Sequence, residues 1–115
     1  MKPMVAFVTA ATSDEATRIA RALVEERLAA CVNILAPIAS VYRWEGQVQQ
    51  DSEVLLVIKT TDARLPALIR RVKALHSYQV PEIIAVPISD GSPEYLRWVL
   101  DETREVAPPD ANASG

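Results

Sequence analysis

The sequence predicts an α+β domain in which two helices lie on one face of a four-stranded antiparallel sheet. Three observations carry this prediction. Strand-like and helix-like stretches follow one another in the order βαββαβ, and one more helix pattern comes after them. Glu45-Gly46 divides a long β-rich stretch into a hairpin. Pro37 lies in the second strand, which the ferredoxin-like arrangement of this element order places at a sheet edge, where a missing N–H is tolerated.

The length and composition indicate a single folded domain. The chain has 115 residues, half of them apolar, which is enough to bury a core. We assign residues 1–104 to this domain. The tail, 105–115, ends in "APPDANASG" and is expected to be disordered, because it offers little apolar surface that folding could bury.

The first strand and the first helix are predicted near the start of the chain. Residues 4–9 are a short apolar run rich in β formers. Thr12 and Glu15 have the spacing of a capping box, in which Thr12 accepts a backbone hydrogen bond and Glu15 reaches back. A helix is therefore predicted from Thr12 to about Ala30. Its apolar stripe consists of Ala16, Ile19, Ala20, Leu23 and Val24.

Residues 31–44 and 47–61 are predicted to be the two strands of the hairpin. As a strand, 31–44 would span roughly 45 Å. The first predicted helix would be only about 27 Å long. The hairpin should therefore extend beyond the helices that cover the sheet, and an extended ribbon of this kind is suited to pairing with a neighbouring chain.

A helix, a strand and a short helix complete the predicted fold. Asp62 is expected to cap the second helix, which has Pro66 in its first turn and ends at about His76. Residues 82–89 are the fourth strand. Ser92-Pro93-Glu94 then opens the last helix.

The strands carry more apolar residues than a two-layer monomer needs. A sheet with helices on one face should alternate apolar and polar residues, but residues 5–8, 54–58 and 83–86 are continuous apolar runs. Each large aliphatic side chain left in water forfeits about 1.5 to 3 kcal/mol of burial. We therefore predict an obligate homo-oligomer whose subunits cover the second face of the sheet.

Charge, cysteine content and the known motifs narrow the possible functions. The net charge of −3 gives no basic surface for nucleic acid, and no apolar run approaches the roughly 18 residues of a membrane span. The single cysteine, Cys31, indicates a reducing compartment, so we expect a cytoplasmic protein. With one histidine and none of the common zinc, nucleophile or phosphate-loop motifs, the chain is not expected to be an enzyme.

Three residues are candidate metal ligands, and each has a structural alternative. His76 has an imidazole suited to Cu(II), zinc or nickel, but at a helix end it can equally serve as a C-terminal cation or cap. Cys31 is either a soft copper ligand or a buried structural thiol. Glu82 follows His76 across a turn at Pro81. Because metal sites usually need about four ligands, one chain would have to share the site with its symmetry mates.

Five further residues are assigned to a ligand cleft or a subunit interface. Aromatic residues at the hairpin end favour packing between subunits but could line a cleft. Lys59 could bind an anion or simply mark the end of an apolar strand. The complete set is Tyr42, Trp44, Lys59, Tyr78 and Trp98.

Four stretches of the sequence resemble, in order, the signature blocks of the CutA family of divalent-cation tolerance proteins: "ERLAACVNI", "SVYRWEG", "EVLLVIKT" and "HSYQVPEI". The resemblance runs from about residue 4 to 103. It implies a cytoplasmic homotrimer of ferredoxin-like subunits that binds copper or another divalent metal ion, with no organic cofactor. The trimer is also similar in shape to PII signalling proteins, so a regulatory module that binds a small anion at subunit clefts is the alternative.

Two residues depart from the family pattern in the fourth block. The family usually has a proline where this chain has Ser77, and a glutamate where it has Gln79. Losing that carboxylate near His76 should weaken any cation site that depends on it.

Overall fold

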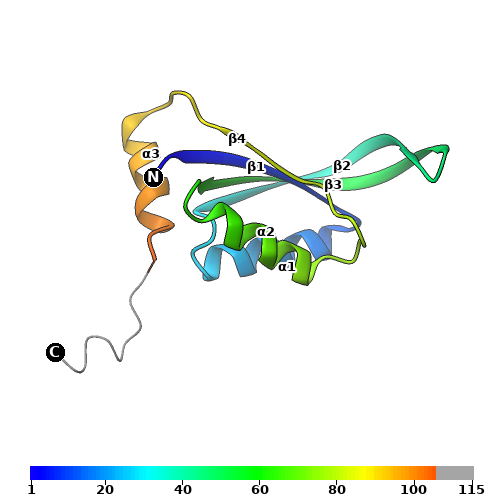
Figure 1. The fold of residues 1–115 in the computed structure, drawn as a ribbon, viewed down its shortest axis with the longest axis horizontal. Coiled ribbons are helices and arrows are strands. Elements are labelled where there is room, and N and C mark those ends of the chain that lie inside the picture. The colour runs from blue at the N-terminus through cyan, green and yellow to red at the C-terminus, as the bar shows by residue number, and fades with distance from the viewer. Residues whose placement is uncertain (106–115) are drawn as a thin grey trace, which may run out of the picture.

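The computed structural model describes residues 1–105 and confirms the predicted fold class (Figure 1). The strands form one antiparallel sheet in the order β2-β3-β1-β4, so β1 and β3 are central and β2 and β4 are the edges. The expected disorder of the tail falls almost wholly outside the described residues. The elements are β1 (Pro3–Ala10), α1 (Ser13–Glu25), β2 (Cys31–Trp44), β3 (Gln47–Thr61), α2 (Leu65–Leu75), β4 (Ile83–Pro87) and α3 (Pro93–Glu102).

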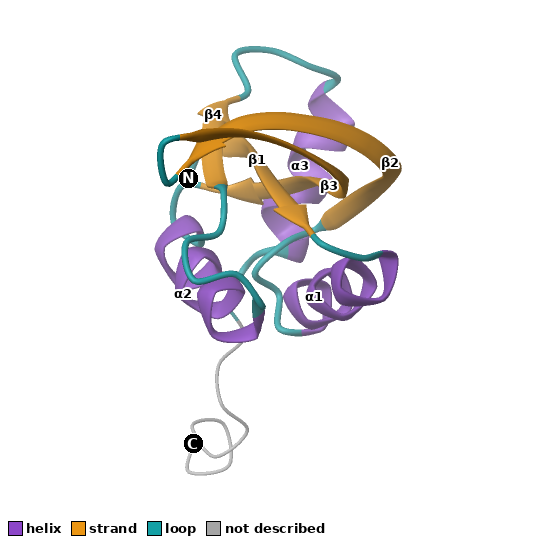
Figure 2. Ribbon diagram, turned by 90° about the vertical axis from the view of Figure 1, so that its right-hand side faces the viewer, coloured by secondary structure: helices purple, strands orange, loops and turns teal. Residues whose placement is uncertain are grey.

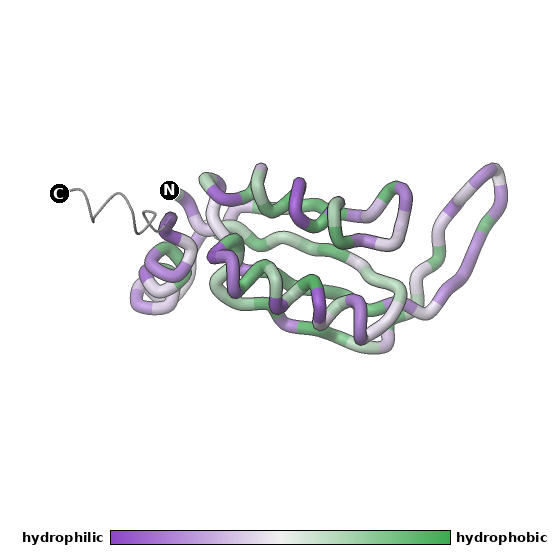
Figure 3. Tube along the Cα trace, turned by 90° about the horizontal axis from the view of Figure 1, so that it is seen from below, coloured by the Kyte–Doolittle hydropathy of each residue, from purple (hydrophilic) through white to green (hydrophobic). Residues whose placement is uncertain are grey.

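The core lies between the sheet and the two helices α1 and α2, which cover the same face (Figure 2). Alternate strand residues point into it. Ala6, Val8, Leu56 and Ile58 are completely buried there, opposite apolar side chains of both helices. Figure 3 shows the resulting pattern, with hydrophobic residues along the central strands and alternating hydrophobic and hydrophilic residues along the helices.

The opposite face of the sheet, which we call the open face, is also apolar. Strand register places Leu35, Phe7 and Ile84 on it, together with Val86 at the β4 edge. Leu35, Ile84 and Val86 remain 46%, 56% and 48% exposed. α3 contacts β1 and β3 at the end of the sheet near the N-terminus, so it leaves most of this face uncovered (Figure 1). The predicted excess of apolar strand residues is therefore an exposed apolar surface in the single chain.

The β2–β3 hairpin extends well beyond α1 and α2, as predicted (Figure 1). Its register shifts between Leu35 and Ile38, and Pro37 lies within this irregularity on the edge strand. The predicted edge position of Pro37 is confirmed, and the structure adds a register shift at the same place. The far end of the hairpin is largely hydrophilic (Figure 3).

The predicted end of the first helix was wrong. α1 ends at Glu25 rather than near Ala30, because Arg27 takes a left-handed conformation with φ of 58°. The Leu28 N–H then donates to the Leu23 carbonyl and the Arg27 N–H donates to the Val24 carbonyl, which is the Schellman pattern of a helix terminus. Residues 28–30 lead into β2 as a buried connection.

The predicted cap of the second helix was also wrong. Arg64 occupies the N-cap position of α2 and makes no side-chain cap, whereas the Asp62 carboxylate accepts the Lys2 N–H at 2.8 Å. Pro66 lies in the first turn and His76 is the C-cap, both as predicted. β4 is shorter than the predicted strand over 82–89.

Candidate functional site

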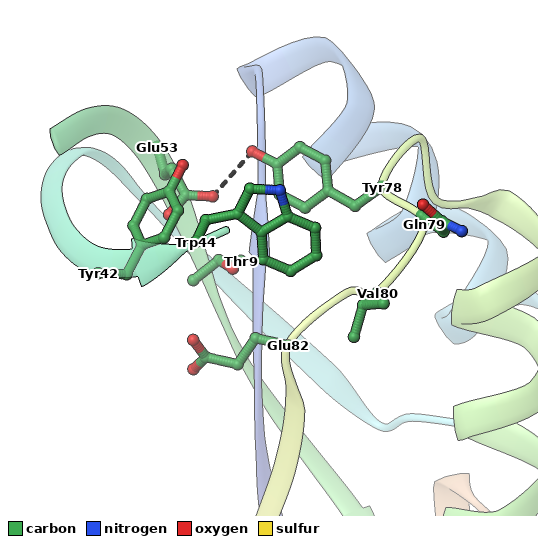
Figure 4. Close-up of a pocket in the computed structure, with 8 residues that line it drawn as sticks. All are labelled: Thr9, Tyr42, Trp44, Glu53, Tyr78, Gln79, Val80 and Glu82. Carbon is green, nitrogen blue, oxygen red and sulfur yellow. Dashed lines mark hydrogen bonds between the residues drawn. The ribbon is translucent and has the colours of Figure 1, made fainter. Parts of the chain in front are cut away.

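A pocket of about 370 Å³ lies at the end of the open face that is farthest from α3 (Figure 4). It collects side chains from four separate stretches of the chain. Aromatic rings and carboxylates dominate its walls, and no lysine, arginine or histidine is among its lining residues. These residues are Thr9, Tyr42, Trp44, Glu53, Tyr78, Gln79, Val80 and Glu82.

The sheet and the hairpin place these side chains by simple alternation. Thr9 is in phase with Phe7 on β1, and Glu53 is in phase with Leu55 on β3, so both project from the open face. Tyr42 and Trp44 are also two residues apart, near the end of β2. The link between α2 and β4 supplies the wall that carries Tyr78.

Both tyrosines of the pocket donate their hydroxyls to carboxylates. The Tyr78 hydroxyl donates to Glu53 Oε2 at 2.8 Å (Figure 4), and Tyr42 donates to Asp51. Burial, the bond to Glu53 and the charge of that carboxylate together raise the pKa of Tyr78 far above its ordinary value. The pKa of Tyr42 is also raised, mainly by its hydrogen bond to Asp51. Both phenols therefore stay protonated and keep these carboxylates anchored.

His76 stands behind the pocket and uses both of its ring nitrogens. Its Nε2 lies 2.7 Å from the Thr9 carbonyl oxygen, and its Nδ1 lies 3.0 Å from the Tyr78 backbone nitrogen. Since the Tyr78 N–H must donate to Nδ1, the proton of the neutral imidazole is on Nε2 and points to Thr9. The ring also packs against Tyr78, with centroids 4.7 Å apart. His76 thus joins β1 to the segment that carries Tyr78.

The buried carboxylate of Glu15 also connects the end of β1 to the segment that follows α2. It accepts hydrogen bonds from the backbone N–H of Ala11 at 3.2 Å and of Ser77 at 2.9 Å. Burial alone would raise the pKa of Glu15, but the hydrogen bonds from Ser77 and Ala11 lower it overall. The Thr12 hydroxyl accepts the Glu15 N–H, so the predicted capping box is present, although Glu15 reaches back to Ala11 rather than to Thr12.

Comparison with known proteins identifies the family to which this chain belongs. Residues 4–102 match the family model described as CutA1 divalent ion tolerance protein. The chain belongs to the CutA1 family. It is 54% identical over 99 residues to the divalent-cation tolerance protein CutA of Thermus thermophilus, covering 86% of this chain and 96% of that protein. It is 49% identical over 102 residues to protein CutA of Mus musculus, covering 89% of this chain and 58% of the mouse protein.

A solved CutA1 structure agrees with the fold. The crystal structure of CutA1 from Oryza sativa superposes with a TM-score of 0.89 at 48% sequence identity, covering 92% of this chain and 97% of that one. The CutA1 relatives named here are described as tolerance proteins or only by family name, and none is named as an enzyme.

The pocket brings together some of the residues predicted from the sequence, and the fold places others elsewhere. Tyr42, Trp44, Tyr78 and Glu82 all line it. His76 lies directly behind it, bonded to Tyr78. Among the predicted metal ligands, only Glu82 therefore faces the cavity.

The other predicted residues lie at the opposite end of the open face. Cys31 is beside the hydroxyl of Tyr95, which in turn packs against Trp98 with ring centroids 5.6 Å apart. Cys31 pairs across the sheet with Lys59, whose amine donates to Asn33. Lys59 is itself paired with Val5, four residues before Thr9 on β1, or about 13 Å of strand. Cys31 and His76 therefore form no dyad within one chain.

Four residues of the pocket were not predicted as site residues: Thr9, Glu53, Gln79 and Val80. Glu53 did carry a signal, because it immediately precedes the apolar run 54–58 and is in phase with Leu55 and Val57. Strict alternation from that run would have placed its carboxylate on the open face. Thr9 and Val80 carried no comparable signal.

Within residues 1–105, no group of three or more His, Cys, Asp or Glu side chains is placed to hold a metal ion. The side-chain donors in the pocket of one chain include the carboxylates of Glu53 and Glu82, the carboxamide oxygen of Gln79 and the hydroxyl of Thr9. None of the helices in this part of the chain combines the length and the apolar character needed to cross a membrane.

Proposed function

We propose that this CutA1-family protein acts in tolerance of divalent cations as a homotrimer that binds copper or another divalent metal ion. The observation that carries the proposal is the acidic pocket at the edge of the open face. Its lining includes Glu53 and Glu82 and no basic residue, so it favours a positively charged ligand.

The open face supports self-association. Burying exposed residues such as Ile84 and Val86 against a second subunit would gain about 1.5 to 3 kcal/mol for each large side chain that becomes fully buried. The protruding hairpin adds a second surface for contact between subunits. Three subunits is the number that the family resemblance implies.

The metal ligands are proposed to come from more than one subunit. Each chain offers Glu82 in the pocket and Cys31 at the far end of the open face, and repetition around a symmetry axis would multiply these donors. His76 can join a metal only by giving up one of its two hydrogen bonds, because both ring nitrogens are engaged. Carboxylate-rich binding with a smaller contribution from His76 is the expected outcome.

Metal titration of matched variants tests this proposal. Calorimetry with Cu(II) and with Zn(II) should show saturable binding that Glu82→Gln weakens at least tenfold and Cys31→Ser weakens for Cu(II). Gln79→Glu adds a carboxylate to the pocket wall and should strengthen binding about threefold or more. Unchanged stoichiometry and affinity in Cys31→Ser, His76→Ala and Glu82→Gln would remove all three residues as ligands.

The alternative, a PII-like module that binds a small anion, finds less support in this pocket, because two carboxylates would repel the ligand. The arginines Arg64, Arg70 and Arg71 line a shallow hollow on the helical side instead. Arg71 is already held there by Glu26 at 2.9 Å. A thermal shift with nucleotides or small carboxylates would be needed to revive the anion hypothesis.

A cytoplasmic location is also proposed, on the basis of the single cysteine and the family resemblance. Cell fractionation followed by immunoblotting tests it. Recovery of the protein outside the cytoplasmic fraction would contradict it.

A further inference from the structure

The pocket has two chemical features that a metal ion does not use together. Its carboxylates, Glu53 and Glu82, attract positive charge, and its walls are largely aromatic. In the single chain, Trp44 and Tyr42 are 47% and 41% exposed, and both line the cavity instead of packing into the core. Aromatic faces offer no lone pairs to a metal but attract organic cations through the ring quadrupole.

The hydrogen bonds of the two tyrosines strengthen this attraction. The Tyr78 hydroxyl donates to Glu53, and the Tyr42 hydroxyl donates to Asp51. A phenol that donates to a carboxylate has a more electron-rich ring, which binds cations better through its face. Because both hydroxyls are committed to carboxylates, a ligand meets the rings and not the polar ends of these side chains.

The size and the spread of these groups define the ligand. A volume of about 370 Å³ lies at the small end of the range for ligand pockets, about 300 to 1,000 Å³. In Figure 4, Glu53 lies on the side of the pocket that carries Tyr42, Trp44 and Tyr78, and Glu82 lies on the other side. We infer that this pocket binds a small organic ammonium ion, whose alkyl groups contact Trp44 and the tyrosines while its charge faces Glu53 and Glu82. The inference does not rest on metal binding.

A pair of probes that differ only in charge tests the inference. Choline and 3,3-dimethyl-1-butanol have the same shape, but the second has a neutral carbon in place of the ammonium nitrogen. Calorimetry should show saturable binding of choline and at least tenfold weaker binding of the neutral alcohol, as expected for a partly desolvated cation over aromatic rings. Equal binding of both compounds, or no saturable binding of choline, would overturn the inference.

The chain offers a clean optical signal for the same experiment. It has two tryptophans, Trp44 in the pocket and Trp98 on α3 outside it. In a Trp98→Phe background, choline should change the fluorescence of Trp44 with the affinity found by calorimetry. Trp98→Phe itself should leave that affinity unchanged.

Variants then locate the site. Trp44→Leu should weaken choline binding at least tenfold, and Glu82→Gln about threefold or more, while circular dichroism confirms that both are folded. If Trp44→Leu is misfolded, Glu82→Gln serves alone, and unchanged affinity in the folded variant contradicts the inference. Trp44→Leu removes no metal ligand, so its Cu(II) affinity should be retained. The two proposals can therefore fail separately.

Discussion

His76 is the only histidine of the chain, and it connects two parts of the fold through both ring nitrogens. It holds the Thr9 carbonyl of β1 and the backbone of Tyr78, and Tyr78 then reaches Glu53 on β3. A protonated imidazole would present a donor to the Tyr78 N–H, which is itself a donor. The neutral ring is therefore part of the structure that shapes the pocket wall.

Ser77, at the position where the family resemblance leads us to expect a proline, makes a contact that proline cannot make. Its N–H donates to Glu15 at 2.9 Å. His76, with φ of −82° and ψ of 142°, already has a backbone conformation that suits a following proline. Ser77→Pro should lose a charge-assisted bond of about 1.5 to 3 kcal/mol. It should regain about 0.4 to 1 kcal/mol from a stiffer unfolded chain.

The expected result for Ser77→Pro is thus a net loss of about 1 kcal/mol in the free energy of unfolding, measured in urea. Ser77→Ala keeps the N–H and removes only the hydroxyl, so it should lose less. A proline variant at least as stable as the alanine variant would show that the amide bond to Glu15 contributes little.

Glu15 should also give the stability a pH dependence in the acid range. Burial opposes the effect, but hydrogen bonds from Ser77 and Ala11 hold the folded-state pKa of Glu15 below its ordinary value of about 4.3. Its stabilising contribution is therefore complete above about pH 5 and is lost as the pH falls through the lower, folded-state pKa. Urea unfolding between pH 7 and pH 3 should show a shallower decline for Glu15→Gln than for the wild type, and parallel curves would contradict this assignment.

Among the helices within residues 1–105, only α1 and α3 have a serine or threonine at the N-cap, and only in α1 does its side chain accept a cap hydrogen bond. The Thr12 hydroxyl accepts the Glu15 N–H at 3.1 Å, whereas Ser92, at the N-cap of α3, makes no side-chain cap. Thr12→Ala should therefore lower the free energy of unfolding by about 1 kcal/mol. Ser92→Ala, measured at the same protein concentration, should change it by less than about 0.5 kcal/mol. Equal losses in the two variants would show that the Thr12 hydrogen bond is not the cause.

The element order and the edge position of β2 could be predicted because they follow from local pattern and from the missing N–H of Pro37. The errors lay where tertiary contacts overrode local preference. Asp62 has the composition of a helix cap, but its carboxylate is taken by Lys2, 60 residues away in the sequence. α1 ends at a left-handed Arg27, a position where sequence rules look for glycine.

The candidate site could be predicted only in part, for a related reason. Local sequence indicated that Tyr42, Trp44, Tyr78 and Glu82 were available for a cleft, and the structure brings them together. It could not indicate that Cys31 lies at the other end of the sheet, since that depends on strand register. Nor could it indicate that both nitrogens of His76 are already bonded, because the Thr9 carbonyl is 67 residues away in the sequence.

At the scale of the whole molecule, the open face is expected to decide the oligomeric state. Ile84, which lies on the edge strand β4 and pairs with Phe7 of β1, is 56% exposed, so Ile84→Asp should be tolerated by the single chain. In an assembly, the same change would bury an unpaired charge, which costs several kcal/mol. Light scattering should show a trimer for the wild type and a single chain for Ile84→Asp.

A matched surface variant separates this effect from a general effect of added charge. Val24 is 42% exposed and lies on α1, away from the open face. Val24→Asp should retain the assembly. A wild-type protein that is a stable, dispersed single chain at micromolar concentration would contradict the predicted role of the open face.

The pocket is lined by residues of β1, β2, β3 and the segment between α2 and β4. A bound ligand would therefore contact all four stretches at once and make the local unfolding of each less favourable. Ligand binding should slow amide hydrogen exchange in all four stretches, including at residues that do not contact the ligand. This pattern of protection could be used to screen cell extracts for the natural ligand before its chemical identity is known.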